Sequence, residues 1–387
     1  MSLRDESLRK HKKWHGKIEI VSKVRINTSE DLAIAYTPGV AEPCKEISKN
    51  IEKIYDYTIK SNTVAIITDG SAVLGLGNIG SKAALPVMEG KAVLFKEFAD
   101  INAFPICLDT EDPEKIIETV KLISPAFAGI NLEDIAAPKC FLIEERLKKE
   151  LDIPVFHDDQ HGTAIVVLAG LINALKIVGK DIKNLKVVIN GAGAAGIAIA
   201  KLLLKFGIKN IVLCDKKGIL HKDEDWLNFA QAELALKTNP EGLRGSLEKA
   251  IIGADVFVGV SAGNVVTREM IESMNDEPIV FAMANPIPEI MPDEAKRAGA
   301  KIVGTGRSDF PNQVNNVLAF PGIFKGALKC RKQITDEMKI AAAYAIAKMV
   351  PEKKLSVDNI LPKAFEPKIA DKVAEAVIKV ANGGRFF

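Results

Sequence analysis

The stretch "LKVVINGAGAAGIAIAKLLLKFGIKNIVLCD" at residues 185–215 places a glycine-rich loop between a short β-branched run and an apolar helical segment. The loop follows the pattern G-x-G-x-x-G. Gly191 permits the tight turn, Gly193 lets a pyrophosphate approach the backbone, and Gly196 lets the following helix lie close to the sheet. Because the pattern has meaning only between a strand and a helix, and both are present, the stretch predicts a Rossmann-type dinucleotide-binding unit.

The residues around this loop define the expected contacts of the dinucleotide. A helix that begins near Ala194 and Ala195 offers free peptide N–H groups to a phosphate. Asp215 ends the second strand about 20 residues beyond the loop, where it can accept a hydrogen bond from a ribose hydroxyl. An acid in that position favours NAD, but Lys216 and Lys217 follow directly and could neutralise the extra phosphate of NADP. We therefore expect NAD, with NADP as the alternative.

Short apolar runs rich in β-branched residues alternate with helical patterns along most of the chain, which predicts an α/β fold with parallel sheets covered by helices. The runs are at residues 63–68, 153–156, 185–190, 210–215, 254–260, 278–285 and 300–306. After Pro321 the pattern becomes helical. We predict an N-terminal α/β domain over residues 1–160, a doubly wound Rossmann-type domain over 161–329, and C-terminal helices over 330–387 that pack back on the first domain.

A second G-x-G-x-x-G pattern, "GLGNIG" at residues 75–80, lacks the context of the first. It follows the run "TVAIITDG" only after the intervening residues "SAVL", and no strand that ends in an acid follows at the required distance. The loop does not by itself predict nucleotide binding. Peptide N–H groups at a helix start there would still attract an anion such as a substrate carboxylate, so Gly75 and Gly77 are candidate substrate-binding residues.

The composition excludes several classes of partner. The chain has 52 basic and 50 acidic residues, and its net charge of +2 gives no electrostatic basis for binding nucleic acid or a membrane surface. The longest apolar stretch, residues 163–175, is shorter than the ~20 residues of a spanning helix and predicts a buried helix. Five scattered cysteines without a Cys-x-x-Cys pair, and an N-terminus unlike a signal peptide, lead us to expect a cytoplasmic protein with reduced thiols.

Two acidic pairs follow short apolar runs in the first domain, Glu133–Asp134 in "INLEDI" and Asp158–Asp159 in "FHDDQHGT". Acids at the ends of neighbouring strands would repel one another without a cation, and oxygen ligands suit Mg²⁺ or Mn²⁺. The alternative is that each pair is a solvated loop charge. His157 and His161 suggest zinc, but a third nitrogen or sulfur ligand is missing nearby, so we expect ordinary loop histidines.

Two further residues have a sequence context that favours chemistry. Lys91 lies between apolar stretches in "LPVMEGKAVLF", where desolvation or a nearby cation would lower its pKa towards that of a base. Tyr36 precedes a Thr-Pro-Gly turn that would fix its position. Each of the two, taken alone, is also compatible with a structural role.

Eight motifs in register resemble the malic enzyme family, in its short prokaryotic form. They are "YTPGV" (36–40), "TDGSAVLGLGNIG" (68–80), "MEGKAVLF" (88–95), "LEDI" (132–135), "FHDDQHGTA" (156–164), "NGAGAAG" (190–196), "FAMANP" (281–286) and "NNVLAFPGIF" (315–324). The resemblance runs from about residue 10 to about residue 330. It implies that the N-terminal domain binds substrate and metal, and that the protein converts L-malate to pyruvate and CO₂ with NAD(P)⁺ and a divalent metal.

The resemblance also assigns roles to residues. It implies that the metal ligands are Glu133, Asp134 and Asp159, that the catalytic groups are Lys91 as general base, Tyr36 as general acid and Asp158 beside them, and that Asn285 and Asn316 contact substrate and cofactor. It further suggests a homodimer or higher homo-oligomer, in which the segment with Tyr36 reaches into the site of a partner.

One departure from the family concerns the substrate carboxylate. Longer members carry an arginine just before "LGLG", and here Ala72 occupies the corresponding place. A bidentate carboxylate clamp is therefore missing at this position. We expect the amides of the loop at residues 75–80, with Ser71 nearby, to bind the carboxylate instead.

Two other functions remain open from the sequence. One is a metal-dependent 2-hydroxy acid dehydrogenase that stops at the keto acid. The other is a nucleotide-sensing regulatory protein that uses the second domain as a redox sensor. A sensor has no use for Lys91, Tyr36 and an acidic cluster, which argues against the second.

Overall fold

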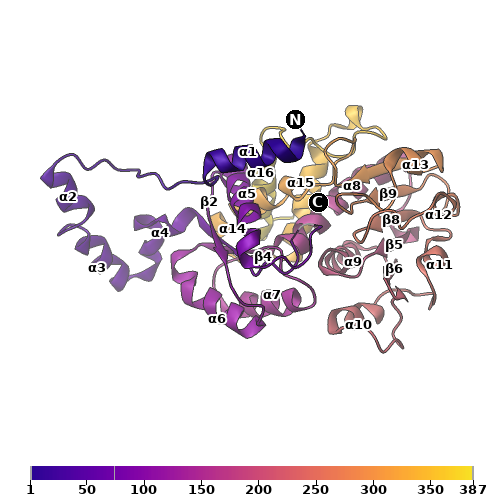
Figure 1. Ribbon diagram of the computed structural model, residues 1–387, viewed down its shortest axis with the longest axis horizontal. Helices are drawn as coiled ribbons and strands as arrows, with labels where there is room; N and C mark the ends of the chain where they lie inside the picture. Colours follow the sequence, from indigo (N-terminus) through magenta and orange to yellow (C-terminus); the bar gives the residue numbers. More distant parts are fainter. Residues whose placement is uncertain (1, 74, 386–387) are drawn as a thin grey trace.

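The computed structural model describes residues 2–73 and 75–385, and its two parallel sheets lie in the two halves of the chain. In Figure 1 the second sheet, with its strands β5, β6, β8 and β9, lies at the opposite end of the molecule from α2 and α3. The C-terminal helices lie between the two ends. The mixed α/β class with a Rossmann-type second half, predicted from the sequence, is confirmed.

The first sheet is entirely parallel, with strand order β2-β1-β3-β4. Its strands are β1 (Thr63–Thr68), β2 (Asn102–Cys107), β3 (Gly129–Leu132) and β4 (Val155–His157). The carboxyl ends of β3 and β4 are adjacent, because Leu132 pairs with His157. The residues that follow these two strands therefore meet at one edge of the sheet.

The second sheet has the strand order β10-β9-β8-β5-β6-β7, in which all strands except β7 are parallel. Its strands are β5 (Lys186–Asn190), β6 (Asn210–Asp215), β7 (Gly218–Ile219), β8 (Val256–Gly259), β9 (Ile279–Ala282) and β10 (Ile302–Thr305). The chain order reverses between β5 and β8. This switch point is where doubly wound sheets bind dinucleotides.

Helices cover both sheets. The α-helices before the second sheet are α1 (Leu3–Trp14), α2 (Ser29–Ala35), α3 (Ala41–Lys49), α4 (Ile54–Tyr57), α5 (Ser81–Ala99), α6 (Pro113–Ile123), α7 (Lys139–Glu150) and α8 (Asp158–Val178). The later ones are α9 (Ala194–Phe206), α10 (Phe229–Ala235), α11 (Leu247–Ile251), α12 (Arg268–Glu272), α13 (Pro292–Arg297), α14 (Phe320–Cys330), α15 (Asp336–Lys348) and α16 (Ile369–Ala381). Short 3₁₀ turns are η1 (Ile51–Lys53), η2 (Ile59–Asn62), η3 (Ser124–Ala126), η4 (Ile182–Asn184), η5 (Asn316–Leu318) and η6 (Glu352–Lys354).

Helix α8 joins the two halves and lies in the main hydrophobic core. It is long and apolar enough to cross a membrane, but 72% of its most apolar window is buried inside the protein. It packs against α9 of the second half and against α15. The stretch at residues 163–175 is therefore the buried helix that its composition predicted.

The C-terminal helices pack on both halves. Helix α16 packs on α14 and α15 and also contacts α5, while α15 packs on α8. The approach of α16 to α14 is close because a Cβ at Gly322 would come within 2.5 Å of Val373 Cβ, and one at Gly326 within 2.7 Å of Val377 Cβ. The predicted return of these helices to the first half is confirmed. The domain limits at residues 160 and 329 remain predictions.

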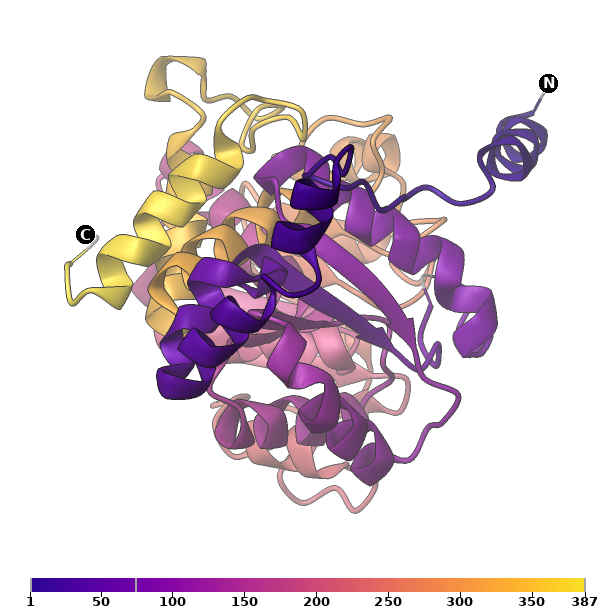
Figure 2. The same cartoon turned by 90° about the vertical axis from the view of Figure 1, so that its left-hand side faces the viewer.

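The segment of residues 18–50, here called the N-terminal arm, carries α2 and α3 away from the body (Figure 1). Every residue of the arm is half-buried or exposed. Several apolar side chains of the arm are exposed to solvent, such as Ile20 (86% exposed) and Ile34 (68% exposed). Figure 2, in which the arm end faces the viewer, shows α1 standing clear of the body as well. Apolar surface of this kind normally marks an interaction site.

Replacement of Asn173 tests how α8 holds the C-terminal region. Asn173 is fully buried, and its Nδ2 donates to the carbonyl oxygens of Ala347 (2.8 Å) and Ile360 (3.0 Å). Asn173→Ala removes both donors and leaves a cavity, so we expect the free energy of unfolding to fall by roughly 2–4 kcal/mol in urea titration. The exposed Asn184→Ala should change it by less than about 0.5 kcal/mol. Equal effects of the two variants would contradict this role.

Candidate active site

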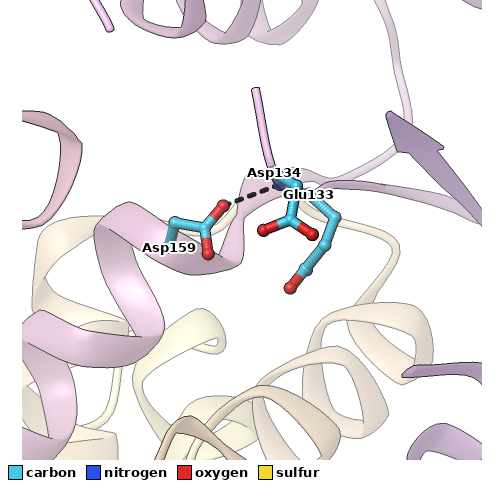
Figure 3. Close-up of side chains that lie close together, drawn as sticks. All are labelled: Glu133, Asp134 and Asp159. Atoms are coloured by element: carbon cyan, nitrogen blue, oxygen red, sulfur yellow. Dashed lines mark hydrogen bonds between the residues drawn. The ribbon is translucent and has the colours of Figure 1, made fainter. Parts of the chain in front are cut away.

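Three carboxylates from the ends of β3 and β4 meet at the edge of the first sheet, as Figure 3 shows. Glu133 and Asp134 follow β3, and Asp159 is the second residue of α8, which begins directly after β4. One oxygen atom from each lies within 4.8 Å of the other two. The backbone N–H of Asp134 donates to Asp159 Oδ2 at 2.8 Å, the dashed line in Figure 3. The predicted convergence of the acidic pairs is therefore present in the structure.

Lys91 of α5 contacts Glu133 of this cluster and the neighbouring Asp158. Its Nζ lies 2.5 Å from Asp158 Oδ2 and 2.8 Å from Glu133 Oε1, and it lies over the ring of Phe320 at 4.3 Å. The side chain of Lys91 is only 10% exposed, and that of Asp158 is fully buried. Asp158 Oδ1 is buried without a hydrogen-bond partner among the residues that the structure describes. Lys91 and Asp158 thus form a buried ion pair in which Asp158 Oδ1 can still accept a hydrogen bond.

The electrostatics of the cluster favour a bound cation. Burial, with the nearby carboxylates of Asp159 and Asp158, raises the pKa of Glu133 to about 8 although Lys91 opposes this. Burial and the carboxylate of Asp134 raise the pKa of Asp159 to about 7. Groups of this kind lose a proton readily to a hard divalent cation, and three oxygen ligands fit Mg²⁺ or Mn²⁺. The donor set therefore suits the metal that the sequence predicted.

The pKa of Lys91 differs from the expectation. Burial by itself would lower it, but the carboxylates of Asp158 and Glu133 outweigh burial and raise it above its ordinary value. The sequence context of apolar neighbours was correct, yet it did not show that two acids distant in sequence face the same ammonium group.

The two histidines near the acids are not loop residues. His157 ends β4 and is fully buried, and burial lowers its pKa to about 4. His161 lies in the first turns of α8 and its Nε2 is 2.8 Å from Glu144 Oε1. Burial also lowers the pKa of His161 to about 3. Both therefore stay neutral beneath the cluster, and the expectation of loop histidines is corrected.

A cavity of about 470 Å³ lies over the cluster, between the two halves of the chain. Its lining brings together eight predicted site residues: Gly75, Lys91, Glu133, Asp134, Asp159, Ala195, Asn285 and Asn316. Asn316 is tied to the cluster, because its Nδ2 donates to Asp158 Oδ2 at 3.3 Å and its Oδ1 accepts from Thr163 Oγ1 at 3.0 Å. Ala72 also lines the cavity. Among the described lining residues Lys91 is the one cation.

A second cavity, of about 730 Å³, lies over the switch point of the second sheet. Gly191, Gly193, Asp215 and Lys216 line it, as the dinucleotide fingerprint predicted. Asp215 is held in place, because its Oδ1 accepts from the backbone N–H of Lys216 at 2.6 Å and its Oδ2 accepts from Gln231 Nε2 at 3.0 Å. Ser261 lines both cavities. The two cavities thus meet at one wall.

Tyr36 and Gly77 lie outside this arrangement, and the predicted cofactor-binding residues Ala194 and Gly196 are not among the described lining residues of either cavity. Tyr36 is the C-cap of α2 in the N-terminal arm, is 67% exposed, and is absent from the described lining of both cavities. Gly77 is exposed and open to solvent, with space for a side chain but a φ of 75°. Ser71 is engaged elsewhere, since its hydroxyl donates to Asp69 Oδ1 and accepts from the N–H of Ala136. Gly75 remains the part of that loop in contact with the cavity.

Several residues of the site gave no signal in the sequence. Thr163 and Ser261 line the acidic cavity, and Gln231 orients Asp215. Glu289 is fully buried and accepts hydrogen bonds from the backbone N–H groups of Ser261 and Ala284. The capping pattern Asn228-x-x-Gln231 marks a helix start, but the contact of Gln231 with Asp215 depends on the tertiary fold.

Two glycine variants test separately how the dinucleotide loop contributes to folding stability and to dinucleotide affinity. A Cβ at Gly196 would lie 1.8 Å from the carbonyl oxygen of Gly191, whereas one at Gly193 meets no atom within 4 Å. Gly196→Ala should lower the free energy of unfolding by more than about 2 kcal/mol, because backbone must move. Gly193→Ala should change it by less than about 0.5 kcal/mol.

Dinucleotide binding gives the second readout of this pair. Because the methyl group of Gly193→Ala occupies space next to the phosphates, we expect its dissociation constant for the dinucleotide, measured by calorimetry, to rise at least about tenfold. A stable Gly196→Ala, or unchanged binding by Gly193→Ala, would contradict the geometry of the loop.

Comparison with known proteins agrees with both cavities. Residues 15–148 match the model of the malic enzyme N-terminal domain, and residues 160–382 match that of the malic enzyme NAD binding domain. The bifunctional malic/malolactic enzyme of Bacillus subtilis is 61% identical over 98% of this chain and 93% of its own length. The NAD-dependent malic enzyme of Geobacillus stearothermophilus is 58% identical over 95% of this chain and 77% of its own length.

A solved structure is similarly close. The NAD-dependent malic enzyme of Thermotoga maritima superimposes with a TM-score of 0.93 and 54% identity, over 96% of this chain and 98% of that one. Two domain models in register and relatives of this identity over nearly the whole length show that the chain belongs to the malic enzyme family.

Proposed function

We propose that the protein oxidises and decarboxylates L-malate to pyruvate and CO₂, with NAD⁺ as the hydride acceptor and Mg²⁺ or Mn²⁺ as the metal. The observation that carries the proposal is the buried contact of Lys91 with Glu133 and Asp158 beside the three-carboxylate cluster. This contact lies in a cavity that shares the Ser261 wall with the dinucleotide cavity. Base, ligands and hydride acceptor would thus converge on one substrate.

The residues of the cluster would hold the metal through Glu133, Asp134 and Asp159. When bound, the divalent cation supplies Lewis-acid polarisation of the substrate's C2 oxygen and offsets the negative charge of the carboxylates. Lys91 would first give up a proton, for which Asp158 is the nearest acceptor, and its neutral amine would then take the proton of the C2 hydroxyl as hydride passes to the nicotinamide. Asp158, at 2.5 Å from Lys91 Nζ, would orient the amine.

The amides in the wall would position substrate and cofactor. Asn316 is fixed by Asp158 and Thr163, and Asn285 stands at the junction of the cavity with the second half. Because Ala72 provides no cation, the distal carboxylate of malate would be met by these amides and by the backbone near Gly75. A carboxylate that is held without a salt bridge leaves more readily as neutral CO₂.

Loss of CO₂ leaves an enolate that must be protonated at C3, which is the role proposed for Tyr36. Tyr36 lies on the arm, away from the cavity of its own chain. We propose that the arm of one protomer completes the site of its partner in a homodimer. The exposed apolar side chains of the arm support this arrangement, because a second copy would cover them.

The choice of NAD rests on Asp215. Its carboxylate lines the dinucleotide cavity and is oriented by Gln231, so that it can accept from a ribose 2′-hydroxyl and would repel a 2′-phosphate. Lys217 is held against Trp226, at 5.6 Å from the ring centre. Lys216 and Lys217 both line the same cavity and are the cations that could compete for a 2′-phosphate. We therefore propose NAD as the preferred cofactor.

Product analysis tests the reaction. With L-malate, Mn²⁺ and NAD⁺ we expect one pyruvate and one CO₂ for each NADH formed, a higher kcat/KM for NAD⁺ than for NADP⁺, and loss of activity with a chelator. Reduction without CO₂ would instead establish the 2-hydroxy acid dehydrogenase. Lactate as the end product would assign the second activity named for the Bacillus subtilis relative.

Metal binding is measured apart from turnover. Asp159→Asn removes a charged ligand while it keeps the size of the side chain, so we expect its Mn²⁺ dissociation constant in calorimetry to rise at least about tenfold. The exposed Asp152→Asn serves as the control and should leave Mn²⁺ binding unchanged. Equal Mn²⁺ affinity in Asp159→Asn and wild type would remove this cluster as the metal site.

A complementation experiment tests the exchange of arms. Tyr36→Phe and Lys91→Ala should each be nearly inactive. If Tyr36 acts on the partner's site, mixed dimers contain one intact site, and random reassociation of equal amounts restores about a quarter of the wild-type activity. If Tyr36 serves its own chain, no mixed dimer holds an intact site and activity stays at the level of the variants.

A further inference from the structure

A buried acid outside the metal cluster, Glu289, stands behind the wall where the two cavities meet. It lies in the loop after β9 and is fully buried. Its Oε1 accepts from the backbone N–H of Ser261 at 2.9 Å, and its Oε2 accepts from the backbone N–H of Ala284 at 3.0 Å. Ser261 follows β8 and Ala284 follows β9, so one carboxylate joins the ends of two neighbouring strands.

The surrounding chain leaves room for this side chain. A Cβ at Gly259 would come within 2.3 Å of Glu289 Cδ, so only glycine at the end of β8 leaves space for the carboxylate. Ser261 is fixed a second time, because its Oγ accepts from Asn190 Nδ2 at 2.8 Å. The carboxylate is thus held at a defined position behind Ser261, next to the switch point between β5 and β8.

Glu289 lies behind the residues that would contact the nicotinamide end of the dinucleotide. Asp215 lines one cavity, where it would hold the adenosine half, and Lys91 lines the other, where the hydride would be delivered. The nicotinamide ring would therefore lie near Ser261, which lines both cavities, and beside Ala284 and Asn285, which line the acidic one. Glu289 supports the first two of these residues from behind.

The charge of Glu289 is balanced by peptide dipoles. Within the described chain no lysine, arginine or histidine nitrogen lies within 4.0 Å of it, unlike Glu133 or Glu144. Burial raises the pKa of Glu289, and the backbone N–H groups of Ser261 and Ala284 oppose this rise. Both carboxylate oxygens accept N–H donors, and such hydrogen bonds favour the charged form. A buried negative charge without a cationic partner stabilises a positive charge that docks nearby. The oxidised nicotinamide ring is positively charged, and the reduced ring is neutral.

We propose that Glu289 is a positioning residue for the nicotinamide end of the cofactor, and that its charge favours binding of NAD⁺ over NADH. The inference rests on the proposed use of NAD. During turnover, hydride transfer to the ring cancels the positive charge and so removes this attraction. Glu289 would thereby assist the release of NADH without touching the reacting atoms.

Calorimetric binding of NAD⁺ and of NADH to the whole protein tests this proposal. In Glu289→Gln the volume stays and the charge is lost, so the dissociation constant of NAD⁺ should rise relative to that of NADH by about threefold or more. Glu294→Gln, an exposed acid of the same half, is the matched control and should leave the ratio unchanged. Because Glu289→Gln puts an NH₂ group against a peptide N–H and could fail to fold, Gly259→Ala is the second variant. Its new methyl group displaces the carboxylate and should move the ratio in the same direction.

The outcomes separate the two proposals. Wild-type protein that binds neither nucleotide overturns the proposed use of NAD and this inference with it. Wild-type binding with an equal loss of NAD⁺ and NADH in both variants assigns Glu289 a purely structural role and overturns the inference alone. An unchanged ratio in Gly259→Ala, when only that variant folds, overturns it too.

Discussion

The contact of Lys91 with Glu133 and Asp158 is the interaction on which the arrangement of the first half depends. It joins α5, the end of β3 and the start of α8 through groups that are almost entirely removed from water. Burial of three acids and one amine is costly, because each charge loses its hydration. Hydrogen bonds from peptide groups, such as that from Asp134 to Asp159, offset part of this cost. The part of the desolvation cost that these hydrogen bonds do not offset favours the binding of a cation by the carboxylates.

The two glycine loops share one pattern and form two different structures. The loop at residues 191–196 lies between β5 and α9, and the register of β5 with β6 brings Asp215 to the same edge. These contacts are local in sequence, so the fingerprint predicted the dinucleotide cavity well. The loop at residues 75–80 follows β1 without a neighbouring strand that ends in an acid. Of the two cavities described, the acidic one is lined by Gly75, and residues 76–80 are absent from the described lining of both.

The contacts that the sequence did not predict are those between segments far apart in the chain. Tyr36 precedes the turn at residues 37–40, as predicted, but its 67% exposure on the arm could not be read from that local pattern. The pKa of Lys91 is raised because Asp158 and Glu133 face it across the fold. Gln231 and Glu289 have no distinctive sequence context. The role of Gln231 follows from its hydrogen bonds to Asp215 and to the carbonyl oxygen of Ala192, and that of Glu289 from the backbone N–H of Ser261.

The two halves of the chain are coupled at the mouth of the acidic cavity. A Cβ at Gly75 would come within 2.6 Å of the carbonyl oxygen of Asn285, so the loop after β1 rests directly on the loop after β9. Glu289 fixes the second of these loops from below, through Ala284. Ala284 and Asn285 of this loop therefore lie between Glu289 and the loop that carries Gly75. Because this contact has no room for a side chain, the loop after β1 and the loop after β9 must keep their relative position at the mouth of the acidic cavity.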